Sequence, residues 1–74
     1  MRDKIKAIMA EVFKIEVDKI KDDATQLDIK EWDSLGHLKL ILELESQFSL
    51  SFEPEEIEEM SSLKEIEKVL TLSC

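Results

Sequence analysis

The sequence predicts an all-α fold: a small four-helix bundle with three longer helices, one short helix and a long loop between the first and second helices. Two observations predict it. The 74 residues include one glycine and one proline, too few for a turn-rich β fold. Apolar side chains also recur at helical spacing in several stretches. A chain of this length is near the smallest that one core can stabilise, so we expect residues 1–74 to form one domain.

The first helix is expected over about residues 3–16, where apolar residues follow the i, i+3, i+4, i+7, i+8 spacing. That apolar stripe consists of Ile5, Ile8, Met9, Val12 and Phe13. Residues 17–33 lose this period and predict a long loop, including a short helical turn and held by scattered apolar anchors. The expected anchors are Val17, Ile20, Leu27, Ile29 and Trp32.

The second helix is expected over about residues 34–48, with Asp33 or Ser34 as its N-cap. Its core stripe consists of Leu40, Ile41, Leu44 and Phe48. A separate apolar line on another side consists of Leu35, Leu38 and Leu42. Two explanations of this second line stay open: it packs against the long loop, or it is a docking strip with an apolar centre and a polar rim.

A short third helix is expected to begin at Pro54, since proline is tolerated in a first helical turn and Glu55 and Glu56 favour a helix N-terminus. It should end near Met60, with Ile57 and Met60 facing inward. Ser62 to Glu65 then reads as a capping box for a last helix that ends near Thr71. The inward residues of that helix are Leu63, Ile66, Val69 and Leu70.

The net charge of −8 is concentrated in one segment. Residues 31–59 carry nine acidic side chains against Lys39 alone, whereas the rest of the chain is balanced. Such a field repels nucleic acid and anionic membranes and favours basic protein partners. The alternative is that the acidic residues only keep a small protein soluble.

Nothing in the sequence indicates a membrane span or a secretory signal, so we expect a cytoplasmic protein, and we expect it to be a monomer. The lone Cys74 cannot form an internal disulfide, and we expect an exposed thiol with no structural role. A calcium loop that starts at Asp22 would place Ala24 at a ligand position and Leu27 at the glycine position. Zinc spacing is also missing. We therefore expect no metal site.

Ser34 is the residue most suited to chemistry, because a hydroxyl at a helix start is accessible and an attached anion would meet the positive end of the helix dipole. The simpler interpretation is that Asp33 or Ser34 is only a cap. A hydrolase triad of Asp33, Ser34 and His37 would need a strand-to-helix turn and an oxyanion hole, and neither is indicated. We expect no catalytic residues. Trp32 is expected to be a packing anchor.

The segment from Trp32 to Leu38 resembles the phosphopantetheine attachment site of acyl carrier proteins. The likeness continues through Phe48, the acidic turn at residues 53–56 and Ser62-Leu63, and the length is that of a free-standing carrier. The resemblance implies that a phosphopantetheinyl transferase attaches the 4′-phosphopantetheine of coenzyme A to Ser34, between Asp33 and Leu35. The arm would then carry acyl groups as thioesters, so the chain would be a carrier and not an enzyme.

The resemblance also implies that the second helix docks the enzymes that load and transfer acyl groups, through basic patches on those enzymes. The expected partner-binding residues are Leu38, Lys39, Leu42, Glu45 and Glu56, with Leu35 beside them.

Fatty-acid carriers are more acidic after the serine, where this chain has Gly36 and Lys39. These departures favour a specialised free-standing carrier in polyketide, lipid-modifying or cell-surface biosynthesis over one that serves fatty acid synthesis. Two alternatives stay open: a peptidyl or aminoacyl carrier, which Trp32 and Asp33 disfavour, and an acidic helical interaction module without a prosthetic group.

Overall fold

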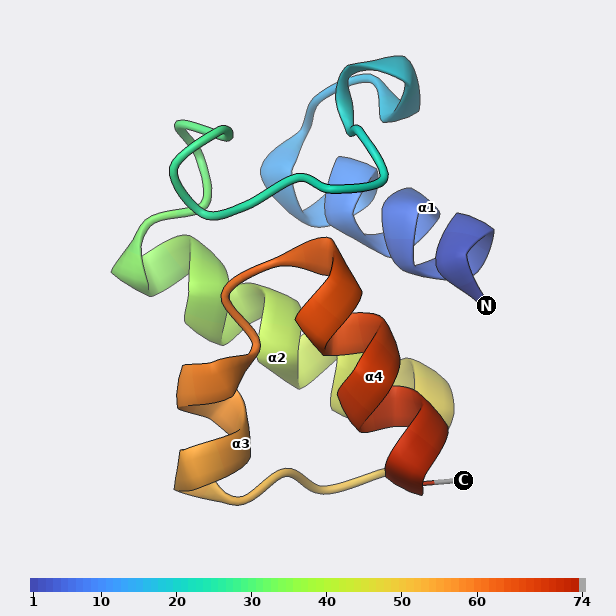
Figure 1. Ribbon diagram of the computed structural model, residues 1–74. Coiled ribbons are helices and arrows are strands. Elements are labelled where there is room, and N and C mark those ends of the chain that lie inside the picture. Colours follow the sequence, from blue (N-terminus) through green and yellow to red (C-terminus); the bar gives the residue numbers. More distant parts are fainter. Residues whose placement is uncertain (74) are drawn as a thin grey trace.

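Four helices and one 3₁₀ turn make up the computed structural model, which describes residues 1–73 (Figure 1). In chain order these are α1 (Arg2–Phe13), the 3₁₀ turn η1 (Val17–Lys19), α2 (Ser34–Phe48), α3 (Pro54–Glu59) and α4 (Leu63–Ser73). The described part of the chain contains no β-strand, only an isolated bridge between Thr25 and Ser62. The predicted all-α bundle is therefore confirmed. Cys74, expected to be an exposed thiol, lies outside the described residues.

The core lies where α1, α2 and α4 pack together, with the long loop covering one end and α3 leaning on α4 (Figure 1). The predicted stripes supply most of it. Their buried members are Ile5, Ile8, Met9, Phe13, Leu40, Ile41, Leu44, Leu63, Ile66, Val69 and Leu70. Val12 and Phe48 pack on the core but are only half-buried. Helical spacing therefore predicted the inward faces correctly, and the half-buried positions lie at their margins.

Helix α1 ends three residues earlier than predicted. Lys14 adopts the left-handed conformation, with φ 57° and ψ 45°, and the backbone N–H groups of Lys14 and Ile15 both donate to the carbonyl of Ala10. These bonds satisfy the end of the helix. Glycine or asparagine usually marks such a cap, and a lysine gives no signal of it in the sequence.

The loop between α1 and α2 contains the expected short helical turn, η1, and three of its predicted anchors are buried: Ile20, Ile29 and Trp32. The other two predicted anchors are wrong. Val17 is 45 % exposed, on η1, and Leu27 is 97 % exposed.

Leu27 is exposed because it lies in a tight turn closed by polar contacts. The Asp28 carboxylate accepts from the N–H and the hydroxyl of Thr25, and Thr25 Oγ1 in turn accepts from the N–H of Leu27. The turn is fixed to the junction of α3 and α4 by two backbone bonds. Gln26 N–H donates to the Ser61 carbonyl at 3.0 Å, and Leu63 N–H donates to the Ala24 carbonyl at 2.9 Å.

The predicted starts of the last two helices are confirmed. Pro54 occupies the first turn of α3, where the N–H of Glu53 donates to Glu56 Oε1 at 3.0 Å. At the start of α4, Ser62 Oγ accepts from the N–H of Glu65 at 3.2 Å, as expected of an N-cap.

An exposed ion-pair network joins α1 to the loop and to α4. Arg2 pairs with Glu67 at 3.0 Å and with Asp22 at 3.3 Å, and Lys6 also pairs with Asp22. The hydrogen bonds and charges of Lys6 and Arg2 lower the pKa of the Asp22 carboxyl, and the bond from Arg2 lowers the pKa of the Glu67 carboxyl.

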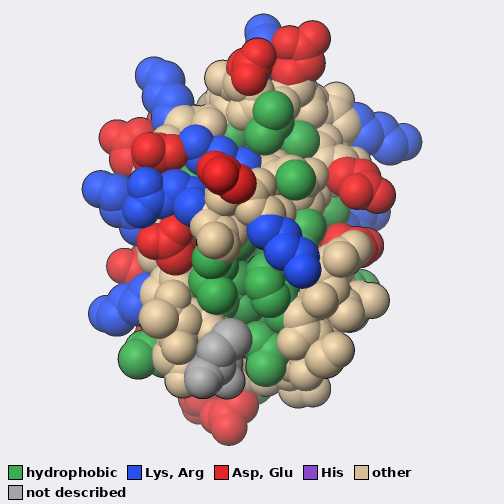
Figure 2. Space-filling view, turned by 90° about the vertical axis from the view of Figure 1, so that its right-hand side faces the viewer, with side chains coloured by type: hydrophobic (Ala, Val, Ile, Leu, Met, Phe, Trp, Pro, Cys, Tyr) green, Lys and Arg blue, Asp and Glu red, His purple; other side chains and the backbone are tan. Residues whose placement is uncertain are grey.

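Figure 2 shows the right-hand side of the view in Figure 1, where charged side chains surround a central group of hydrophobic ones.

Candidate functional site

Ser34 is exposed as the first residue of α2, and the residue before it is the cap. Asp33 has extended backbone angles, φ −92° and ψ −168°, and its Oδ1 accepts from the N–H of Gly36 at 2.8 Å. The sequence left open which of the two residues caps the helix, and the structure assigns this to Asp33. The Ser34 hydroxyl therefore lies at the positive end of the helix without being its cap.

Gly36 lets the loop pass very close to the first turn of α2. A β-carbon at this position would lie 2.2 Å from the backbone carbonyl oxygen of Glu31, a separation that no side chain tolerates. On the sequence alone, Gly36 is a departure from the acidic pattern of fatty-acid carriers. The structure gives it a packing role, because only glycine fits beneath this carbonyl.

Trp32 is the anchor of the turn that bears Ser34, as predicted. It is 1 % exposed, and its ring packs against Phe13 of α1 with 5.8 Å between ring centroids. Its indole N–H donates to Nδ1 of His37 at 2.9 Å. The aromatic contact and the hydrogen bond together hold the residue two positions before Ser34.

His37 is half-buried, as predicted, and both of its ring nitrogens are engaged. Since Nδ1 accepts from Trp32, the ring proton lies on Nε2, which donates to the carbonyl of Ile57 at 2.8 Å. His37 consequently has no free nitrogen to accept a proton from Ser34. The geometry supports the rejection of a hydrolase triad.

The second apolar line of α2 lies on the surface. Leu35, Leu38 and Leu42 are 62, 54 and 65 % exposed. Packing against the long loop, one of the two explanations left open, is therefore excluded. Lys39 is exposed beside these leucines. What remains is an apolar strip on the helix that begins at Ser34, a feature typical of a docking surface.

Two of the predicted partner-binding carboxylates also make contacts within the chain. Glu45 Oε2 accepts from the N–H of Phe52 at 2.9 Å, which fixes the segment after α2. Glu56 accepts from the N–H of Glu53 through Oε1. Sequence reasoning missed the Glu45 contact, because no local pattern connects a helix residue with a backbone N–H seven residues later.

A groove of about 510 Å³ adjoins Ser34. Its walls come from three parts of the chain, and they consist of Thr25, Gln26, Leu27, Trp32, Asp33, Ser34, Ser61 and Ser62. The lining of the groove combines hydroxyl, amide and carboxylate groups with the exposed side chain of Leu27. Sequence reasoning missed Gln26 and Ser61, since backbone bonds between distant residues bring the loop to the junction of α3 and α4.

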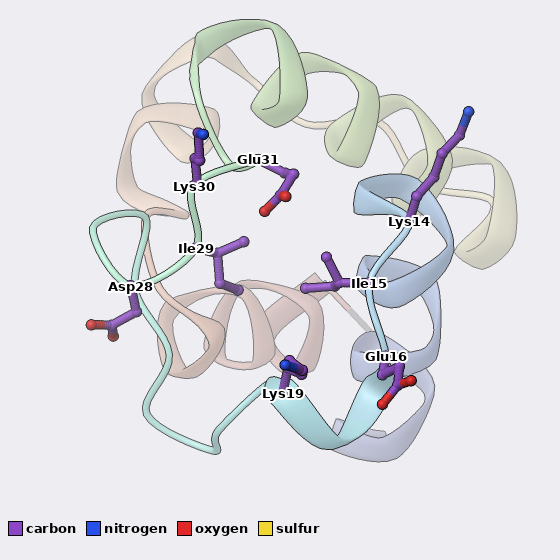
Figure 3. Close-up of a pocket in the computed structure, with 8 residues that line it drawn as sticks. All are labelled: Lys14, Ile15, Glu16, Lys19, Asp28, Ile29, Lys30 and Glu31. Atoms are coloured by element: carbon purple, nitrogen blue, oxygen red, sulfur yellow. The ribbon is translucent and has the colours of Figure 1, made fainter.

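Another hollow, also of about 510 Å³, lies between the end of α1, η1 and the loop, and it does not include Ser34 (Figure 3). Ile15 and Ile29 extend toward each other across it, whereas Lys14 and Asp28 point outward. Its rim mixes lysines with acidic residues and gives no net preference for a charge. We therefore locate the candidate site at the groove beside Ser34.

Residues 1–73 contain no cluster of three potential metal ligands of the histidine, cysteine or carboxylate type. Within the same residues, no helix combines the length and the apolar character that crossing a bilayer requires.

Comparison with known proteins connects this geometry to a chemistry. Residues 3–70 match a family described as the phosphopantetheine attachment site. The chain is also similar to a curated acyl carrier protein from Buchnera aphidicola subsp. Schizaphis graminum (strain Sg). The two are 33 % identical over 61 residues, which cover 82 % of this chain and 77 % of the relative.

Proposed function

Because the chain belongs to the acyl carrier protein family, we propose that Ser34 is the residue that receives its phosphopantetheine arm. Membership makes the chain a carrier with phosphopantetheine as its cofactor, and a substrate of a phosphopantetheinyl transferase, not itself an enzyme. The single observation that supports the choice of Ser34 is its exposed position at the start of α2, next to a separate cap, Asp33.

In the proposed loading reaction, Ser34 Oγ forms a bond to the phosphorus of the arm, while the phosphorus–oxygen bond to the nucleotide part of coenzyme A breaks. The hydroxyl proton leaves with the help of the transferase. The free N–H groups and the dipole at the start of α2 favour the new negative charge. Once attached, the arm supplies a terminal thiol that carries acyl groups as thioesters.

The groove beside Ser34 suits a tether of this kind. Gln26, Ser61 and Ser62 supply groups that donate and accept hydrogen bonds, and Leu27 supplies an apolar side chain at its edge. Amides and short hydrocarbon segments alternate along the arm, so a wall of mixed polarity fits it better than an apolar cleft would. We propose that Asp33 and Leu35 flank the attachment point and that the arm rests in this groove between encounters.

For partner enzymes, we propose docking on the strip formed by Leu35, Leu38 and Leu42. Lys39 lies beside the strip, and Glu45 and Glu56 add negative charge for basic patches on those enzymes. Each of these two glutamates accepts a backbone hydrogen bond within the chain through one carboxylate oxygen. The acidic excess over residues 31–59 would accelerate such encounters.

We further propose that residues 1–74 form one carrier domain, monomeric and cytoplasmic. Among pathways, we place it in specialised lipid, polyketide or cell-surface biosynthesis ahead of fatty acid synthesis, because Gly36 and Lys39 stand where fatty-acid carriers are acidic. The match to the phosphopantetheine family favours a carrier over an interaction module without a prosthetic group. Aminoacyl cargo is the remaining alternative, and mass spectrometry of the native thioester would identify the cargo.

Intact-mass measurement tests the attachment site. The purified chain is incubated with coenzyme A and a broad-specificity transferase, and we expect one phosphopantetheine adduct. Ser34→Ala should abolish the adduct, whereas Ser46→Ala, a change at another exposed serine of α2, should retain it. Absence of an adduct under conditions that load a control carrier, or an adduct on the Ser34→Ala chain, would contradict the proposal.

A further inference from the structure

We infer that His37 is a positioning residue that couples α3 to the turn bearing Ser34. The structural part of this inference is independent of loading, and its consequence for loading rests on the proposed function of Ser34. The coupling runs along a short chain of contacts: the indole of Trp32, the imidazole of His37 and the backbone carbonyl of Ile57 in α3.

The first link determines how the attachment turn is held. Trp32 is almost fully buried, so its indole N–H has no access to water if His37 Nδ1 does not accept its hydrogen bond. An unpaired buried donor is unfavourable. Asp33 and Ser34 follow Trp32 directly in the chain. A displacement of the indole therefore displaces the cap and the hydroxyl with it.

The second link reaches α3, a six-residue helix with no fully buried residue of its own. Among the hydrogen bonds of residues 1–73, the bond from His37 Nε2 to the Ile57 carbonyl is the one that joins α2 to α3. The other packing of α3 is against α4. A short exposed helix of this kind is easily displaced, and this bond would transmit its displacement to α2.

The two bonds are linked because they use opposite nitrogens of one rigid ring. If α3 moves, the imidazole either follows the Ile57 carbonyl and changes its bond with Trp32, or stays and loses the bond with Ile57. A partner that binds α3 would thus alter the position of Ser34. Because coupled equilibria are reciprocal, a change at Ser34 would in turn alter the position of α3.

Substitutions at His37 can separate the two links. In His37→Asn, the amide oxygen occupies roughly the place of Nδ1, so the bond with Trp32 can persist while the reach to Ile57 is lost. In His37→Gln, the amide nitrogen occupies roughly the place of Nε2, so the bond with Ile57 can persist while the bond with Trp32 is lost. Glu56→Ala disturbs α3 at its N-terminal end, because it removes the acceptor of the Glu53 N–H.

The first test is an NMR double-mutant cycle on the unloaded protein. Trp32 is the only tryptophan, so the indole N–H gives one resonance. We expect Glu56→Ala to shift this resonance in the wild-type background and to leave it unshifted in the His37→Asn background. An equal shift in both backgrounds, or no shift in the wild type, would overturn the inference. Neither result depends on whether Ser34 is modified.

The second test is the rate of loading by the transferase. We expect His37→Gln to lower kcat/KM about fivefold, the effect of losing one ordinary hydrogen bond, and His37→Asn to load within about twofold of wild type. Equal losses in both variants would indicate a general effect on folding, and wild-type rates in both would remove any role in positioning. Failure of the proposed function would look different, since the wild-type chain would then take up no adduct.

Discussion

The loop between α1 and α2 is held differently near its middle, at Asp22, and at the end that leads into α2. Near Asp22, polar contacts are ion pairs with Arg2 and Lys6 on the surface, where water and salt weaken them. Near Ser34, the contacts are a buried indole, a hydrogen-bonded imidazole and a glycine beneath a backbone carbonyl. The end that bears Ser34, the proposed attachment residue, is thus held by short directional contacts. A functional group held in this way keeps its position under changing conditions.

The largest effect should come from Gly36→Ala. The added methyl group would meet the Glu31 carbonyl oxygen at 2.2 Å, so the loop or the helix must move. We expect the free energy of unfolding to fall by about 3 kcal/mol, the upper part of the range for overpacking. Urea denaturation followed by circular dichroism measures it. The exposed Ser46→Ala on the same helix should change stability by less than about 0.5 kcal/mol. Equal effects of the two changes would show that the close approach is not important.

A smaller effect should follow Trp32→Phe, which keeps an aromatic ring but removes the donor to His37. Nδ1 of a half-buried imidazole would then lose its partner. We expect the free energy of unfolding to fall by about 2 kcal/mol, because the hydrogen bond is missing and the ring is smaller. Chemical denaturation monitored by circular dichroism would measure the change. Phe13 offers a matched comparison, because Phe13→Leu disturbs the same aromatic contact without touching the hydrogen bond. If Trp32→Phe were neutral, the bond to His37 would not hold the turn.

A smaller loss of stability is expected for Glu45→Gln. The amide oxygen can still accept from Phe52 N–H, but the bond loses its charge assistance. We therefore expect the free energy of unfolding to fall by about 0.5–1 kcal/mol. Glu43→Gln is the control, since Glu43 only contacts the exposed Gln47 one turn away, and such pairs contribute about 0.2–0.5 kcal/mol. Thermal unfolding of both variants compares the two sites. A control as unstable as Glu45→Gln would mean that the Phe52 contact has no special role.

The smallest effect should come from the ion pairs of Asp22, near the middle of the loop. The pKa values of Asp22 and Glu67 are lowered in the folded state, so these carboxylates stabilise the fold above their unfolded pKa values. This contribution is lost as the pH falls through their lowered folded pKa values. Asp22→Asn should reduce the dependence of stability on pH between about pH 5 and pH 3, and should matter less in high salt. An unchanged pH profile would exclude a stabilising ion pair.

Periodicity predicted what depends on local spacing. The inward faces of α1, α2 and α4 follow from apolar positions three or four residues apart. The proline start of α3 and the exposed helix start at Ser34 follow from residue types that favour a first helical turn or a cap. Features formed by residues distant in the chain were missed. The bond of Glu45 to Phe52 and the joining of Gln26 to Ser61 depend on tertiary packing. The early end of α1 at Lys14 depends on a left-handed backbone conformation that a lysine does not predict.

The exposure of Leu27 shows the same limit from another side. A leucine among polar residues predicts an anchor on hydrophobicity alone. The contacts of Thr25 and Asp28 close a turn that places this leucine on the surface, and side-chain hydrogen bonds of this type override a weak apolar preference. The candidate site could therefore be located from the sequence at one residue, Ser34, while its groove needed the folded chain.

The assignment of the helix cap to Asp33 has a consequence for the proposed attachment at Ser34. Because the Asp33 carboxylate, and not the Ser34 hydroxyl, accepts from the N–H of Gly36, esterification of Ser34 would leave the capping bond of α2 intact. The loaded and unloaded forms would therefore share the same helix start.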